Sequence, residues 1–184
     1  YSGRMQESLD AYAPELFHVH SVDNTDTGYR VPAVVQIVGV TYRQLDHWAR
    51  TGLVEPSVRA ATGSGSQRIY SFRDLLVLKI VKRLLDTGIS LQQIRVAIDH
   101  LRDRGTRELA STHLFSDGTT VYECTSEAEV FDLLRGGQGV FGIAVGPTLT
   151  ELAGQVANMP SEDATSAGGV DELAQRRRSR ARTA

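Results

Sequence analysis

A short helix behind a glycine turn constrains this chain most, and it lies in the stretch Gly39–Leu53, GVTYRQLDHWARTGL. Thr41 and Gln44 have the S/T-x-x-E/Q spacing of a capping box, which predicts a helix that begins at Tyr42. The glycine at position 52 is a typical stop signal. The stretch therefore predicts a helix of about ten residues with defined ends.

At about 100° per residue, this helix has two different faces. Leu45 and Trp48 fall on an apolar side. Arg43, His47 and Arg50 fall on the opposite side, which is basic. An ordinary helical hairpin gives no reason for three basic residues to share a face, so the pattern favours a DNA recognition helix.

A second helix is predicted directly before this one. Pro32 suits a first helical turn, and Gly39 ends the segment. Between them, Val34, Ile37 and Val38 supply an apolar stripe at helical spacing. Two helices joined by so short a turn form a helix-turn-helix.

The segment that follows, VRAATGSGSQRIYSF, predicts a β-hairpin with a Gly-Ser tip between short extended arms. Arg59 and Arg68, one on each arm, are placed to bind phosphates, and Tyr70 adds a hydroxyl donor. A Gly-Ser loop alone is more often an ordinary connection. Its position directly after a helix-turn-helix favours the wing of a winged helix.

Two further helices complete this unit. One begins at Ser71 and stops near Gly88, and the next begins at Ser90, forms a capping box with Gln93, and ends at Gly105. Their basic side chains are interpreted as a solvated face, apart from those near the Gly88 turn, which are expected to approach DNA. These side chains are Lys79, Lys82, Arg83, Arg95, Arg102 and Arg104.

The net charge of −2 hides an uneven distribution. Residues 29–105 carry twelve Lys or Arg and six acids, a net charge of +6, whereas residues 1–28 carry −4 and residues 106–170 carry −7. The last fourteen residues carry +3. A basic module between acidic flanks favours nucleic acid as a partner.

The sequences VPAVVQIVGVTYRQLDHWARTGLVEPS and GSGSQRIYSFRDLLVLKIVKRLLDTGISLQQI resemble the DNA-binding domain of the MerR family of transcriptional regulators. The likeness runs through residues 29–104. It includes the GV turn, the L-x-x-W helix, the GL-x-x-P ending, the R-x-Y wing and the D-x-G-I-S-L turn. The string YRQLD-x-WARTGL is similar to an actinobacterial subgroup that includes mycobacterial regulators.

The resemblance implies a winged helix-turn-helix that binds pseudo-palindromic promoter DNA as a homodimer and distorts it, with RNA polymerase as a further partner at the promoter. It places Tyr42, Arg43 and His47 against bases or adjacent phosphates, and makes Arg43 the reader of a guanine. The full predicted DNA-binding set is Thr41, Tyr42, Arg43, Gln44, His47, Arg50, Arg59, Arg68 and Tyr70.

Two features depart from the family pattern. Most members have L-R-Y-Y where this chain has L-D-H-W, so Asp46 stands in place of a phosphate-contacting Arg. We expect Asp46 to pair with Arg43 or Arg50 and to orient them. The second departure follows Gly105, where many members continue into a long dimerisation helix and this chain does not.

Residues 106–158 predict a small β-hairpin–α–β–α unit. The D-G pair at 117–118 marks a hairpin, and Ser126 with Glu129 caps a helix. GVFGIAV is interpreted as a buried strand, and Pro147 begins a last helix. The unit is acidic and is expected to point away from DNA as a dimerisation or effector domain, without a recognisable effector pocket.

Catalysis has no signature in this sequence. No Ser/His/acid set, pair of carboxylates in an apolar context or phosphate-cradling motif is present, so we expect no enzyme, no cofactor and no metal site. The one cysteine, Cys124, excludes an internal disulfide and is interpreted as packed rather than reactive. No apolar run approaches the ~20 residues that span a bilayer, and a cytoplasmic, nucleoid-associated protein is expected.

These observations predict an α+β protein in four parts. A flexible acidic arm (1–28) precedes a winged helix-turn-helix of four helices and a β-hairpin wing (29–105), a C-terminal dimerisation or effector domain (106–158) and a disordered tail with an Arg-rich end (159–184). The predicted function is sequence-specific regulation of transcription. One alternative is an architectural, excisionase-like DNA-bending protein without effector sensing. Another is a protein-interaction module whose acidic C-terminal unit binds a partner.

Overall fold

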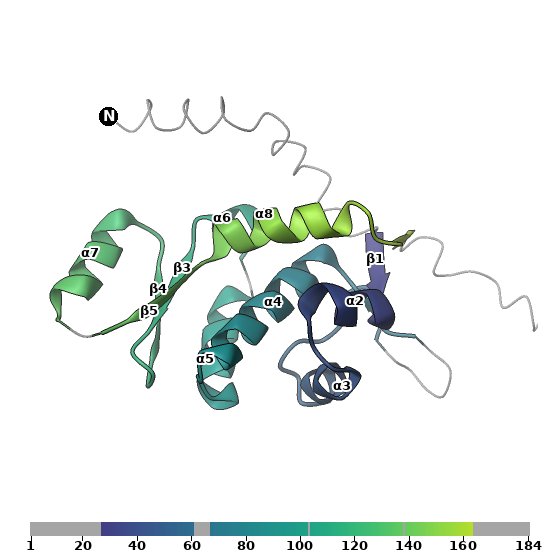
Figure 1. Ribbon diagram of the computed structural model, residues 1–184, viewed down its shortest axis with the longest axis horizontal. Helices are drawn as coiled ribbons and strands as arrows, with labels where there is room; N and C mark the ends of the chain where they lie inside the picture. The colour runs from purple at the N-terminus through teal and green to yellow at the C-terminus, as the bar shows by residue number, and fades with distance from the viewer. Residues whose placement is uncertain (1–26, 61–66, 103, 138, 164–184) are drawn as a thin grey trace, which may run out of the picture.

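The computed structural model describes residues 27–60, 67–102, 104–137 and 139–163 (Figure 1). The predicted acidic arm up to residue 26, the tip of the predicted wing and the Arg-rich tail from residue 164 lie outside them. In chain order the elements are β1 (Thr27–Arg30), α2 (Val31–Val38), α3 (Tyr42–Arg50), β2 (Ile69–Tyr70), α4 (Phe72–Asp86), α5 (Leu91–Leu101), α6 (Thr106–Ala110), β3 (His113–Ser116), β4 (Val121–Cys124), α7 (Glu127–Arg135), β5 (Phe141–Ala144), α8 (Val145–Val156) and β6 (Glu162–Asp163).

Helices α2 and α3 form the helix-turn-helix. Helix α2 has Pro32 in its first turn and ends at Gly39, whose φ of 76° lies in the left-handed region that glycine adopts without a side-chain clash. Helix α3 begins at Tyr42, and both halves of the capping box between Thr41 and Gln44 are formed. The turn between the helices is therefore fixed at both ends by local interactions.

Helices α4 and α5 both begin at capping boxes, and the sequence predicts the one of α5. Ser71 and Asp74 cap α4, and Ser90 and Gln93 cap α5. The chain turns between them at Gly88, whose φ is 88°. Helix α4 is the centre of the fold, because it packs against α2, α5 and α8.

A small antiparallel sheet joins the two ends of the described chain, with strand order β2-β1-β6. Tyr29 of β1 pairs with Tyr70 of β2, and Thr27 of β1 pairs with Asp163 of β6. This corrects the predicted arm and tail, because residues 27–28 and 162–163 are strands. Strands this short have no periodicity of their own and form only through distant partners.

The C-terminal half begins with the short α6, which was not predicted, and continues with β3, β4, α7, β5 and α8. Strands β3 and β4 pair across the D-G turn, and β5 pairs with the other edge of β3. The prediction that β5 is buried is wrong at Phe141, which is 47% exposed. Strand β5 is an edge strand, so only part of it is covered.

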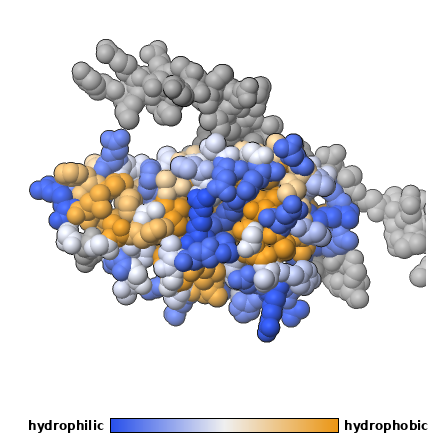
Figure 2. Space-filling model, in the orientation of Figure 1, coloured by the Kyte–Doolittle hydropathy of each residue, from blue (hydrophilic) through white to orange (hydrophobic). Residues whose placement is uncertain are grey.

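One apolar core runs through both halves of the chain. Leu75 and Ile80 of α4 belong to the same buried cluster as Leu149 and Leu152 of α8. Helix α8 lies along α4 and α2, while α7 stands at the far end of the molecule (Figure 1). Figure 2 shows hydrophobic residues still at the surface at that α7 end. The two segments predicted as separate domains thus share their packing.

Candidate nucleic-acid interface

The two faces of α3 are separated as the helical spacing predicts. Leu45 and Trp48 are 1% and 2% exposed and anchor the helix in the core. On the other side Arg43, His47 and Arg50 are exposed. A nine-residue helix with one side buried and the other basic presents its cations to the outside as a fixed group.

The N-terminal end of α3 carries the remaining predicted residues of this helix. Tyr42 is 64% exposed. The side chains of Thr41 and Gln44 are exposed and bind each other in the capping box: Thr41 Oγ1 accepts from the Gln44 backbone N–H at 3.2 Å, and Gln44 Oε1 accepts from the Thr41 N–H at 2.9 Å. Their first role is therefore to fix the start of the helix.

Asp46 connects α3 to the base of the predicted wing. One carboxylate oxygen accepts from Arg68 at 2.7 Å, and the other lies 3.0 Å from Arg50 in an ion pair. The hydrogen bond from Arg68 is the main cause that lowers the pKa of the Asp46 carboxyl below its usual value, and Arg50 adds to it. The expected pairing with Arg50 is confirmed.

The other expected partner of Asp46 was Arg43, which makes no hydrogen bond or ion pair among the described residues. Its guanidinium remains available on the exposed side of α3. The partner that the sequence did not suggest is Arg68, which is 22 residues away along the chain. Only the fold brings it close, so no local pattern could have identified it.

The arms of the predicted wing pair with each other at its base. The backbone N–H of Arg59 donates to the Ile69 carbonyl at 3.1 Å, and the Ile69 N–H donates back at 2.9 Å. Arg59 is half-buried, and the Arg68 side chain is only 16% exposed because it points to Asp46. Arg68 is thus tied to α3 through Asp46, while the tip between the two arms is outside the described residues.

The position of Tyr70 corrects one sequence prediction. Its side chain is 0% exposed, and its hydroxyl has no hydrogen-bond partner among the described residues. Burial raises its pKa to about 12. A side chain buried in the core does not reach a phosphate in this conformation, so Tyr70 is a core residue rather than a DNA contact.

Two arginines of α5 hold the C-terminal end of α3. Arg95 donates to the Thr51 carbonyl and Arg102 to the Gly52 carbonyl, each at 2.9 Å. Cationic donors at a helix C-terminus satisfy its unpaired carbonyls and favour its dipole. These two side chains lie at the surface, as the interpretation of a solvated face expects, and they also position the helix that carries the basic face.

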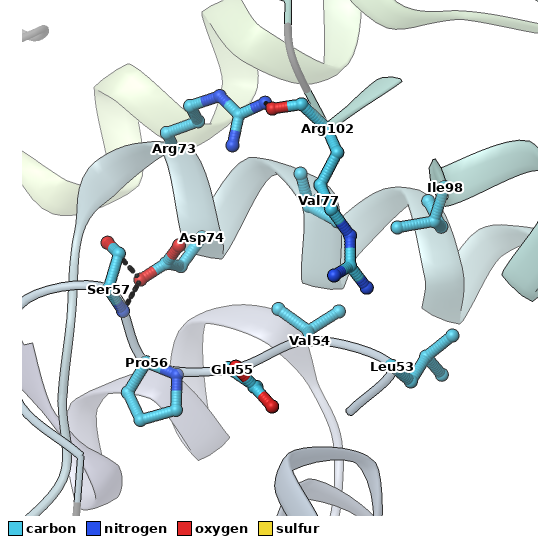
Figure 3. A pocket seen from close by; sticks show the side chains of 10 residues that line it. All are labelled: Leu53, Val54, Glu55, Pro56, Ser57, Arg73, Asp74, Val77, Ile98 and Arg102. Carbon is cyan, nitrogen blue, oxygen red and sulfur yellow. Dashed lines mark hydrogen bonds between the residues drawn. The ribbon is translucent and has the colours of Figure 1, made fainter. Parts of the chain in front are cut away.

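The segment after α3 is fixed against α4 around a pocket of ≈ 250 Å³ (Figure 3). Asp74 accepts from the backbone N–H of Ser57 at 2.8 Å and from its hydroxyl at 2.7 Å, as the dashed lines show. Arg73 donates to the carbonyls of Leu101 and Arg104 at the end of α5. The polar groups at this pocket are therefore used to join α3, α4 and α5.

Comparison with known proteins identifies the family of this helix-turn-helix. Residues 29–101 match the MerR HTH family regulatory protein family. HTH-type transcriptional regulators of Mycobacterium tuberculosis (strain ATCC 25618 / H37Rv) and Mycobacterium bovis are each 62% identical over 173 residues, which are 92% of this chain and 77% of each relative. The chain belongs to the MerR family.

More distant relatives match a shorter part of the chain. Heavy metal-dependent transcription regulator 1 of Rhizobium meliloti is 32% identical over 68 residues, 37% of this chain and 44% of that protein. Among the described residues of the present chain, no three His, Cys, Asp or Glu side chains group as metal ligands would. This MerR-family chain is a transcriptional regulator, and the family implies that it binds DNA.

In this MerR-family protein, acids of the C-terminal half neutralise cations behind α3. Glu151 of α8 pairs with Lys79 and Arg83 of α4, and Glu123 of β4 pairs with Arg104 at 2.7 Å. These cations of the basic module are thus occupied within the fold, and none of the pairs involves α3. No described helix is long and apolar enough to cross a bilayer.

Proposed function

We propose that the chain binds pseudo-palindromic promoter DNA as a homodimer, with α3 of each copy in a major groove, and distorts the DNA between the two sites. The observation that carries this proposal is the exposed basic side of α3, fixed from behind by Trp48 and at both ends by caps. Half-sites about 34 Å apart would present successive grooves to the two helices. RNA polymerase as a partner and a cytoplasmic, nucleoid-associated location belong to the same proposal.

The contacts divide by position on α3. Arg43, whose guanidinium has no partner among the described residues, reads a guanine through two parallel hydrogen bonds. Tyr42 and His47 contact bases or adjacent phosphates. Thr41 and Gln44 lie at the positive N-terminal end of the helix, where a phosphate is favoured. Arg50, Arg59 and Arg68 supply phosphate contacts at the side of α3 that adjoins the wing.

Two substitutions of Arg43 test this assignment. Arg43→Ala removes the charge and the two donors, whereas Arg43→Lys keeps the charge and removes the planar pair of donors. We expect Arg43→Ala to weaken specific binding about 10- to 100-fold, and Arg43→Lys to weaken it nearly as much. Binding of a scrambled duplex should change little with the lysine variant. The measurement is fluorescence anisotropy with the chain's own promoter region in near-physiological salt.

Specific binding that survives Arg43→Ala unchanged would show that the recognition face is assigned wrongly. DNA footprinting distinguishes the proposed regulator from an architectural DNA-bending protein. A short, bounded footprint is expected on the promoter, whereas extended, cooperative coverage of unrelated DNA would favour the excisionase-like architectural role.

A further inference from the structure

Among the described residues, no other element covers the outer side of helix α7. None of its nine residues is buried, and its main contact with another helix or strand is with β4. Its N-terminal end is held by Ser126, whose hydroxyl accepts from the Glu129 N–H, and by Glu129, which accepts from the Thr125 N–H at 2.7 Å. The helix therefore has a formed N-terminal cap and little buried surface.

Two of the exposed residues of α7 are large and apolar. Phe131 is 61% exposed and Leu134 is 50% exposed, and Val130 lies beside them at helical spacing. These three residues, called the α7 surface below, border an open hollow of ≈ 400 Å³ whose other wall includes His113 and Thr125. Figure 2 shows this end of the molecule in hydrophobic colours. Contiguous apolar patches of this kind mark association sites.

The charges at the two ends of α7 are complementary to the same helix running in the opposite direction. Glu127 lies in the first turn and Arg135 in the last turn, and Phe131 lies midway between them. The i, i+4, i+8 spacing puts all three on one side of the helix. Arg135 also lies over the Phe131 ring at 5.7 Å, which confirms the shared side at that end.

An antiparallel pair of α7 helices, centred on Phe131, would set Arg135 of each copy opposite Glu127 of the other. The small Ala128 of one copy would then face Leu134 of the second copy, which leaves room for the larger side chain. The helix dipoles would also oppose each other favourably. A twofold pairing of identical surfaces needs this self-complementarity.

We propose that α7 is the contact between two copies of this chain, formed by antiparallel pairing of the α7 surfaces and closed by reciprocal Arg135–Glu127 ion pairs. The inference rests on the proposed function, because it assigns the homodimer interface of the DNA-binding protein. Helix α7 lies at the end of the molecule remote from α3, so the pairing leaves both basic faces uncovered (Figure 1).

The mass of the full chain in solution tests the apolar part of this contact. Sedimentation equilibrium should show a dimer for the wild type at tens of micromolar. Phe131→Glu should raise the dimer dissociation constant about 100-fold or more, because it puts two carboxylates at the centre of the interface. The matched control is Val96→Glu on α5, which changes another exposed apolar helix residue (58% exposed) and should leave the dimer intact.

Far-UV circular dichroism of both variants checks that the fold is retained. A wild-type chain with the mass of one copy overturns the proposal. So does a Phe131→Glu variant that dimerises as well as Val96→Glu.

Charge reversal tests the antiparallel geometry. Glu127→Arg alone and Arg135→Glu alone should each weaken the dimer about tenfold, because like charges then meet at both ends. A mixture of the two variants should form heterodimers with nearly wild-type affinity, since each arginine then faces a carboxylate of the other chain. Because residues eight apart do not contact each other within one helix, rescue by mixing requires two chains. A mixture that dimerises as weakly as either variant alone would overturn the antiparallel pairing.

Binding to a DNA duplex with one half-site separates this inference from the proposed function. If the Phe131→Glu variant binds a half-site as the wild type does but no longer forms a dimer, both the α7 interface and the proposed DNA-binding function stand. A wild-type dimer that dissociates with Phe131→Glu but shows no preference for promoter DNA would refute the function and keep the interface. Specific DNA binding by a dimer that Phe131→Glu does not affect would refute the interface alone.

Discussion

Asp46 joins α3 to the base of the predicted wing through one carboxylate. It binds Arg68 at 2.7 Å and Arg50 at 3.0 Å, and the hydrogen bond from Arg68 keeps its pKa below the usual value. The carboxyl is therefore ionised throughout the neutral range. An acid at this position reduces the positive charge offered to phosphates while it fixes the direction of two cations. We infer that it favours selectivity over raw affinity.

Replacing Asp46 by Asn keeps its size and removes its charge. We expect Asp46→Asn to bind scrambled DNA more tightly, because the Asp46 charge no longer competes with phosphates for Arg50 and Arg68. The slope of log affinity against log salt should steepen by about one for each phosphate gained. The ratio of specific to non-specific affinity should fall.

The matched control for Asp46→Asn is Asp86→Asn, which removes an equal charge from an acid paired with Lys82 on α4. Anisotropy titrations over a range of salt concentrations measure both quantities. If both variants change the salt slope and the ratio of specific to non-specific affinity equally, Asp46 acts only through net charge.

Tyr70 offers a second test at single-residue scale. Its hydroxyl is buried without a partner among the described residues, and such a group costs free energy when water is lost. Tyr70→Phe should therefore leave the free energy of unfolding unchanged or raise it by about 1 kcal/mol, with DNA affinity unaltered. Urea unfolding and anisotropy check the two expectations. A severalfold loss of DNA binding would show instead that the hydroxyl reaches the DNA.

At the scale of helices and strands, the elements fixed by local rules were predictable from the sequence. The starts of α3, α5 and α7 follow from a capping residue and its partner three positions on, and α2 ends at the glycine that local sterics favour. The hairpin of β3 and β4 follows from its D-G turn. In each case the interacting residues are near neighbours in the chain, so spacing alone identifies them.

Elements that depend on distant partners were not predictable in the same way. Strands β1 and β6 exist because residues 27–28 meet residues 162–163, and no local pattern marks either segment. The arginines of α5 resemble a solvated face until the fold places them at the carbonyls that end α3. The candidate site was therefore predictable in its exposed α3 residues, but not in the side chains that support them.

For the whole molecule, the uneven charge along the sequence has a structural explanation. The acidic C-terminal half supplies partners for cations of the basic half, above all through Glu151 of α8, which binds Lys79 and Arg83 on α4. Arg83 also donates to Thr148 on α8. The same helix contributes Leu149 and Leu152 to the common core. Helix α8 is thus joined to α4 by ion pairs and by apolar packing.

The contribution of the Glu151 ion pairs to the stability of the fold decreases at acidic pH. The hydrogen bond from Lys79 is the main cause that lowers the pKa of Glu151 below its usual value of 4.5. Because the pKa is lower in the folded chain than in the unfolded chain, the ionised carboxylate stabilises the fold above pH 4.5. That stabilisation is lost as the pH falls through the lowered pKa.

Glu151→Gln removes this contribution and leaves the buried Lys79, 7% exposed, without its anionic partner. We expect a loss of about 1–2 kcal/mol in the free energy of unfolding at pH 7, below the range for fully buried pairs because Glu151 is itself exposed to water. The difference in the free energy of unfolding between Glu151→Gln and the wild type should shrink as the pH is lowered from 4.5 toward 3. Glu55→Gln, at an exposed acid in the segment after α3, is the control and should change little at either pH. Urea unfolding measures all three proteins, and a loss from Glu151→Gln that is the same at pH 7 and pH 3 would show that α8 is held by packing and not by this carboxylate.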